Sequence, residues 1–192
     1  MRLRRVILGK VFALVACVGA GALFLGFAAA QTPQKGATPA PPARAPGAPV
    51  ANLAQLMRGI LLPSSNIIFY AQSNDPAAVK PADDPSSATD PLASSYGGWT
   101  AVENSGLALS EAARLLTLPG RLCSNGRPVP VTNPDWVKFV AGLRAAGLNA
   151  YDAAKTKNTD KMLDAADKIS TACQNCHDRY REKPGGVPDR CM

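Results

Sequence analysis

Four stretches of this 192-residue chain repeat their apolar residues every three or four positions, and this spacing limits the fold more than any other feature. It places the apolar side chains on one face of an α-helix. The stretches begin near residues 52, 100, 133 and 159, and the sequence contains no convincing strand. Because the loops after the second and third stretches look short, we expect an all-α protein folded as an antiparallel four-helix bundle.

Local sequence signals agree with helices at these places. Asn52 and Gln55 have the form of a capping box at the start of the first helix. Pro63 has no N–H to donate to the residue one turn earlier, so we expect the first helix to be kinked or interrupted there. Asn133 followed by Pro134 is typical of a helix start.

Residues 1–30 have the pattern of an export signal. Basic residues come first, an uncharged run follows from Val11 to Ala30, and the three alanines that end it fit a cleavage site. Two alternatives stay open, namely an uncleaved membrane anchor formed by the same run and a lipid attached to Cys17. In all three cases the rest of the chain lies outside the cytoplasm, and we expect it in the periplasm.

Residues 31–50 are rich in proline and alanine and predict a disordered linker. The expected folded domain therefore covers residues 51–192. The formal charge is +7, but four positive charges belong to residues 1–30, so only +3 remains on the rest of the chain. This charge is too small and too dispersed to indicate nucleic-acid binding.

The last helical stretch carries the clearest chemical motif. Cys173 and Cys176 are three residues apart, and His177, the only histidine of the chain, follows directly. On a helix these three side chains project from one face. Two thiols placed in this way can each add to a vinyl group of one porphyrin, while the imidazole reaches the iron. C-x-x-C-H is the attachment motif of c-type haem, so we expect one covalent haem c.

Other interpretations of the motif fit less well. A thioredoxin-like C-x-x-C pair needs a βαβ context that the sequence lacks. A zinc site would need a fourth ligand and a less helical spacing. A disulfide between Cys173 and Cys176 would leave the histidine unexplained. We expect no enzymatic activity, because His177 would be used as the iron ligand and no second histidine exists for acid–base catalysis.

The segment CQNCHDRYR resembles the C-x-x-C-H-x-x-[FY]-R signature of the cytochrome c′ family. The resemblance extends from about Asn52 to Glu182 and implies a four-helix bundle with haem near the C-terminus. It implies thioether bonds at Cys173 and Cys176 and an axial imidazole at His177. Tyr180 and Arg181 match the aromatic and basic residues of the signature. Class I cytochromes c, in contrast, carry the motif near the N-terminus.

The resemblance also implies that the first helix faces the iron opposite His177. High-spin relatives present an apolar residue there, and low-spin relatives present a methionine. Met57 lies on the apolar side of the first helix, with Leu56 beside it as the other candidate. A core-filling role for Met57 stays open. Arg58 is a candidate partner for a haem propionate.

Two functions follow from these alternatives. If Met57 binds the iron, the protein is expected to carry single electrons between redox partner proteins. If it does not, the expected function is binding of nitric oxide or carbon monoxide at a five-coordinate iron. A homodimer and a monomer stay open as the assembly of the protein. The remaining cysteines, Cys123 and Cys191, are expected to form a disulfide outside the cytoplasm, with two free thiols as the alternative.

Overall fold

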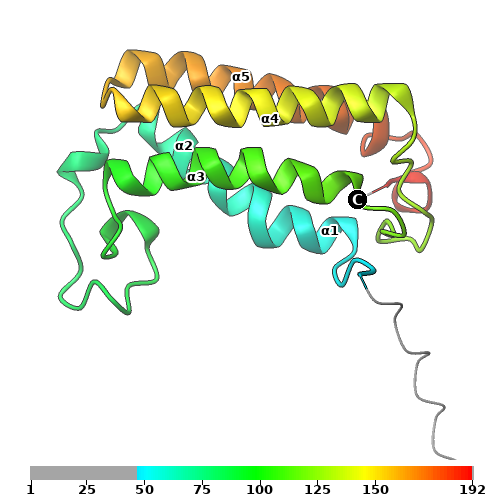
Figure 1. The fold of residues 1–192 in the computed structure, drawn as a ribbon, viewed down its shortest axis with the longest axis horizontal. Helices are drawn as coiled ribbons and strands as arrows, with labels where there is room; N and C mark the ends of the chain where they lie inside the picture. The colour runs from blue at the N-terminus through cyan, green and yellow to red at the C-terminus, as the bar shows by residue number, and fades with distance from the viewer. Residues whose placement is uncertain (1–46, 192) are drawn as a thin grey trace, which may run out of the picture. The chain divides into compact units, whose positions relative to one another are not determined.

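The computed structural model describes residues 47–191, and the prediction of an all-α chain is confirmed for this range. The expected export signal, the possible anchor and most of the expected linker lie outside the described residues. The α-helices are α1 (Leu53–Leu56), α2 (Leu62–Ala71), α3 (Trp99–Ala112), α4 (Pro134–Lys155) and α5 (Thr159–Tyr180), and Figure 1 shows how they pack. Within residues 47–191 the only β-type pairing is an isolated bridge between Leu122 and Pro128.

The first helical stretch is one run with a change of hydrogen bonding in its middle. It starts with the predicted capping box, in which Asn52 accepts from the Gln55 N–H and the Gln55 side chain accepts from the Asn52 N–H. After α1 the chain forms a π-helix, η1 (Met57–Leu61), and then α2. Pro63 lies in the first turn of α2, where a missing N–H is tolerated. The expected interruption at Pro63 is therefore a π-turn that precedes it.

The helices α4 and α5 lie side by side and are joined by a turn of residues 156–158. Asn158 ends this turn and caps α5 by accepting from the Lys161 N–H at 2.9 Å. Helix α3 approaches α4 very closely, since a Cβ atom built on Gly147 would lie 2.7 Å from the Ser110 nitrogen. Only glycine allows this backbone contact, so the sequence sets the distance between α3 and α4 there.

The connection between α3 and α4 consists of a 3₁₀ helix and an irregular loop. A 3₁₀ helix, η4 (Ala113–Thr117), extends α3, and an irregular loop then runs to Pro134. The Trp136 residue is only 1% exposed. Its indole N–H donates to the carbonyl of Leu116, in η4, at 3.1 Å. Shorter 3₁₀ turns occur at η2 (Pro76–Ala78), η3 (Pro91–Ala93) and η5 (Val187–Asp189).

The core is built mostly from aliphatic side chains, as the apolar stripes predict. Its fully buried members include Leu53, Ile68, Val102, Leu109, Met162 and Ile169. Among residues 47–191, no helix combines the length and apolar character needed to cross a membrane.

Candidate functional site

A cavity of about 590 Å³ lies beside the C-terminal half of α5. Its size falls within the range of roughly 300–1,000 Å³ that is usual for ligand and cofactor pockets. Three groups of residues line it: aliphatic side chains, the aromatic rings of Phe69, Trp136 and Phe139, and the end of α5. An apolar cavity with few polar groups suits a flat, largely apolar cofactor.

The three residues of the C-x-x-C-H motif all line this cavity. Cys173, Cys176 and His177 lie in the last two turns of α5, and their side chains are half-buried. Both cysteines are free thiols that pack against the core. The helical spacing therefore brings two thiols and one imidazole to the same cavity wall, as the sequence predicted.

Burial controls the protonation of these three groups. It raises the pKa of the Cys173 thiol, and together with the Cys173 and Asp135 charges it raises the pKa of Cys176 to about 11. Burial and then the charge of Arg181 lower the pKa of His177. At neutral pH both sulfurs are therefore protonated thiols and the imidazole is neutral, which is the form that binds a metal.

Met57 reaches the same cavity from the first helical run. It is the first residue of η1, its side chain is half-buried, and Leu53 and Leu61 line the cavity with it. Leu56, the other candidate from the sequence, is 4% exposed, packs in the core and is not among the lining residues. Of the two neighbours, Met57 is therefore the one that the fold brings to the cavity with His177.

The other predicted contacts also lie at the cavity. Arg58 and Arg181 both line it; Arg58 is exposed, and Arg181 pairs with Glu182. The N–H groups of Arg181 and Glu182 both donate to the His177 carbonyl at 2.8 Å. These bonds end α5 just after the motif and hold the backbone of His177 in place.

Sequence reasoning missed Asp135, which connects the start of α4 to the end of α5. The Tyr180 hydroxyl donates to its Oδ1 at 2.5 Å, and Arg179 Nε donates to its Oδ2 at 3.0 Å. The Tyr180 ring also meets the Trp136 ring edge to face, with centroids 4.9 Å apart. The only available signal was an acidic residue in the first turn of a helix, which also has an ordinary explanation in the helix dipole.

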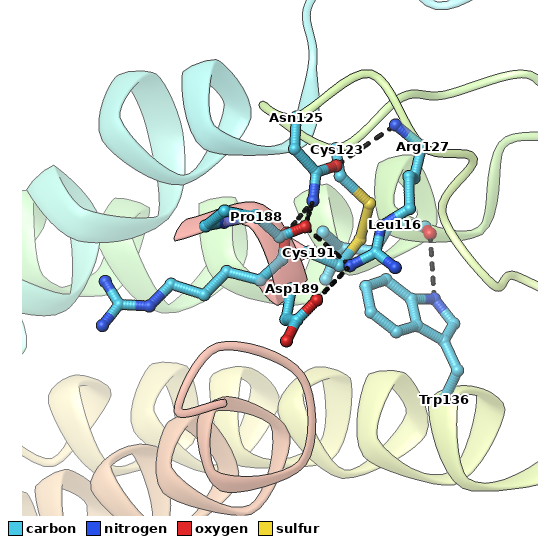
Figure 2. Close-up of a disulfide and its surroundings, with 9 residues drawn as sticks. Leu116, Cys123, Asn125, Arg127, Trp136, Pro188, Asp189 and Cys191 are labelled. Atoms are coloured by element: carbon cyan, nitrogen blue, oxygen red, sulfur yellow. Dashed lines mark hydrogen bonds and ion pairs between the residues drawn. A yellow bond between two sulfur atoms is a disulfide. The ribbon is translucent and has the colours of Figure 1, made fainter. Parts of the chain in front are cut away.

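Cys123 and Cys191 form a disulfide in the structure, which is the pairing expected from the sequence. Figure 2 shows this disulfide between the loop before α4 and the C-terminal segment, next to Trp136. Cys191 also lines the cavity, and its N–H donates to the Tyr180 carbonyl at 2.9 Å. The described residues after α5 therefore turn back toward the end of that helix, and Cys191 forms part of the cavity wall.

The residues present fit a haem better than a metal held by side chains alone. Within residues 47–191, no three His, Cys, Asp or Glu side chains gather in a way that could hold a metal ion. Thiols that form bonds to carbon do not need to converge on a metal, and the apolar cavity beside them can take a porphyrin. Comparisons with protein-family models, with curated proteins and with solved structures found no match for this chain.

Proposed function

We propose that this protein is an exported c-type cytochrome similar to the cytochrome c′ family, with one covalent haem, that carries single electrons. The observation that carries the proposal is the shared cavity, which Cys173, Cys176 and His177 line from α5 and Met57 lines from η1. The proposed fold is an antiparallel four-helix bundle around this cavity. The proposed location is the periplasm, because residues 1–30 resemble an export signal.

The two thiols are proposed to hold the haem. Each would be joined to the haem by a thioether, for which its S–H would add across one vinyl group, with sulfur bonding one carbon and hydrogen the neighbouring carbon. Such an addition would need no oxidant, and both sulfurs already line the apolar cavity. His177 is proposed to bind the iron with its neutral imidazole.

Met57 is proposed as the second residue that would bind the iron. A thioether ligand stabilises ferrous iron and raises the reduction potential of the haem. When bound, the haem supplies an iron that accepts and gives up one electron. The protein contributes an apolar wall that excludes water, with Leu53, Leu61 and Phe69 among its members. Arg58 and Arg181 are proposed to pair with propionates, since both line the cavity and carry planar guanidinium groups.

A second function is proposed only if Met57 does not bind the iron. In that case the wall around Met57 presents mostly apolar side chains, including Leu61, Leu62 and Phe69. A five-coordinate iron facing such a wall would bind nitric oxide or carbon monoxide. Electron transfer requires a redox partner protein, and a homodimer is compatible with either function.

The test is the optical spectrum of the purified protein, oxidised and reduced, with and without carbon monoxide. We expect covalent haem, shown by its mass on the denatured chain, and a low-spin spectrum that carbon monoxide changes little. A high-spin spectrum that shifts on addition of carbon monoxide would favour the gas-binding function. Absence of covalent haem from protein made in a host with haem-attachment machinery would refute both functions.

A further inference from the structure

The loop before α4 is fastened to the start of the first helical run. We call residues 121–129 the brace loop. The Leu53 N–H donates to the Leu122 carbonyl at 2.8 Å, and the Arg121 guanidinium donates to the Ala51 carbonyl. Leu53 lies one helical turn before Met57 and lines the cavity with it. The brace loop therefore holds the first helical run close to the proposed sixth ligand.

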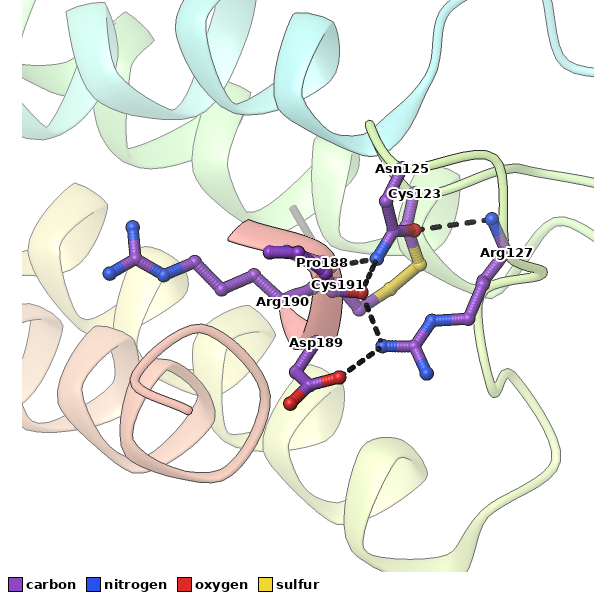
Figure 3. A network of polar contacts seen from close by, with 7 residues as sticks. All are labelled: Cys123, Asn125, Arg127, Pro188, Asp189, Arg190 and Cys191. Atoms are coloured by element: carbon purple, nitrogen blue, oxygen red, sulfur yellow. Dashed lines mark hydrogen bonds and ion pairs between the residues drawn. A yellow bond between two sulfur atoms is a disulfide. The ribbon is translucent and has the colours of Figure 1, made fainter. Parts of the chain in front are cut away.

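The same loop is fastened to the end of α5 through the C-terminal segment. Figure 3 shows the contacts: the Cys123–Cys191 disulfide and the Asn125 amide, which donates to the Pro188 and Arg190 carbonyls at 2.8 and 2.7 Å. The Arg127 guanidinium also donates to the Pro188 carbonyl at 2.8 Å. Because the Cys191 N–H bonds the Tyr180 carbonyl, this attachment acts one turn after His177.

Hydrogen bonds within the brace loop, and one to the Leu115 carbonyl, stabilise its conformation. The Cys123 N–H donates to the Arg127 carbonyl at 2.8 Å, and the Val129 N–H donates to the Arg121 carbonyl at 2.9 Å. The Arg121 side chain is buried, and its Nε–H donates to the Leu115 carbonyl at the end of α3 at 3.1 Å. Because of these hydrogen bonds the loop is expected to move as one unit. A displacement of the C-terminal segment therefore also displaces the start of the first helical run.

We propose that the brace loop sets the separation between Met57 and His177 across the cavity, so that it decides whether Met57 stays on the iron. This inference rests on the proposed cytochrome function. The loop bonds the first helical run directly and the end of α5 through the C-terminal segment, in each case about one turn from the ligand. Cys191 is the part of its attachment that also lines the cavity. Loosening the attachment lets the two walls separate, which weakens the Met57 bond and admits small ligands.

The test uses the haem-loaded protein with Asn125→Ala, which keeps the disulfide. The substitution removes two hydrogen bonds to the C-terminal segment and one inside the brace loop, from the Arg127 N–H. The matched control is Asn74→Ala, which also removes an amide donor to a backbone carbonyl, that of Tyr70, but outside the brace loop and the C-terminal segment. A Cys123→Ser/Cys191→Ser variant removes the covalent attachment. Two quantities are measured, namely amide hydrogen exchange of residues 53–62 and 174–181 and the rate of carbon monoxide binding.

We expect Asn125→Ala to speed exchange in both segments by about tenfold. The two lost hydrogen bonds to the C-terminal segment each change the equilibrium between closed and open states severalfold. Carbon monoxide binding, limited by release of Met57, should speed up by on the order of tenfold. The double serine variant should show larger changes in both quantities, and Asn74→Ala should match the unaltered protein.

Normal exchange and normal carbon monoxide binding in both brace variants would overturn the inference and leave the cytochrome function standing. So would an unaltered protein that already binds carbon monoxide rapidly, because no Met57 bond would then exist to be controlled. A protein without covalent haem would overturn the proposed function itself, and its spectrum identifies this case before the variants are compared.

Discussion

Met57 and Leu56 are adjacent residues with different positions in the fold. Leu56 ends α1 and points into the core, whereas Met57 begins the π-helix and lines the cavity. A helix turns by about 100° per residue, so the side chains of two adjacent residues project in different directions. The choice of sixth ligand is therefore a question about a single residue.

Replacing Met57 with leucine tests this choice. We expect covalent haem to be retained, the spectrum to change from low-spin to high-spin, and carbon monoxide to bind, because leucine fills a similar volume without a sulfur ligand. Met162→Leu is the matched control, since Met162 is fully buried in the α5 core and is not a lining residue. Identical spectra for the two variants would show that Met57 is only a core filler.

The contacts of Asp135 lead to a prediction about how the stability of the protein depends on pH. The Tyr180 hydroxyl bond, and then the Arg179 bond, hold the pKa of Asp135 below its ordinary value. A lowered folded-state pKa means that these contacts stabilise the protein above the pKa of the unfolded chain. The stabilisation is lost as pH falls through the lower folded-state pKa. Asp135→Asn should therefore be less stable than the unaltered protein at pH 7, and the difference should vanish in strong acid.

Thermal unfolding of Asp135→Asn and Asp160→Asn between neutral and acid pH checks this prediction. Asp160 also lies in the first turn of its helix, so its replacement removes the same helix-dipole effect without the Tyr180 contact. Equal losses of stability in the two variants would mean that the Tyr180 and Arg179 bonds contribute nothing beyond that effect.

At the scale of elements, the π-helix η1 interrupts the α-helical hydrogen bonding of the first helical run, and it carries Met57. Single π-turns inside α-helices occur frequently at functional sites. Here the π-turn ends where α2 begins, with Pro63 in the first turn of α2. The proline and the extra residue of the π-turn together set which side chains of the first run meet the cavity.

The close contact between α3 and α4 leads to a prediction about the free energy of unfolding. Gly147→Ala would place a Cβ atom 2.7 Å from the Ser110 nitrogen and 2.9 Å from the Gly106 carbonyl oxygen, so the two helices must move apart. We expect this change to lower the free energy of unfolding by about 1–3 kcal/mol, as overpacking usually does. Equilibrium denaturation by urea measures it.

Gly142 provides the control for that experiment. It lies in the same helix, and a Cβ atom there meets nothing within 4 Å. Gly142→Ala should raise the free energy of unfolding by about 0.5–1 kcal/mol, because alanine loses less backbone entropy in a helix. If both substitutions shift stability in the same direction, the close approach of α3 and α4 is not as the structure describes it.

For the whole molecule, the disulfide joins the loop before α4 to the C-terminus across a separation of 68 residues. Closing a loop of that length restricts the unfolded chain and stabilises the fold by about 4 kcal/mol in the chain-entropy model. Cys123→Ser/Cys191→Ser should lose stability of this order in denaturant unfolding. Reduction of the unaltered protein by a dithiol should reproduce the loss, and an unchanged midpoint in both cases would contradict the prediction.

The sequence by itself determined the helical class, the first-helix cap, the start of α4 and the C-x-x-C-H face. All of these depend on residues within a few positions of one another, so hydrogen-bonding capacity and helical periodicity suffice to predict them. The pairing of Cys123 with Cys191 was also predictable, because only two cysteines remained after the motif and Cys17 were set aside.

Only the tertiary structure decided which side chains share the cavity. It separates Met57 from Leu56, brings Asp135 to Tyr180, and places the brace loop between the first helical run and the end of α5. Asp135 and Tyr180 lie 45 positions apart in the sequence, and Ala51 and Arg121 lie 70 positions apart. Their physical basis is the packing of whole helices and the path of the loop between α3 and α4, neither of which a local pattern of residues encodes.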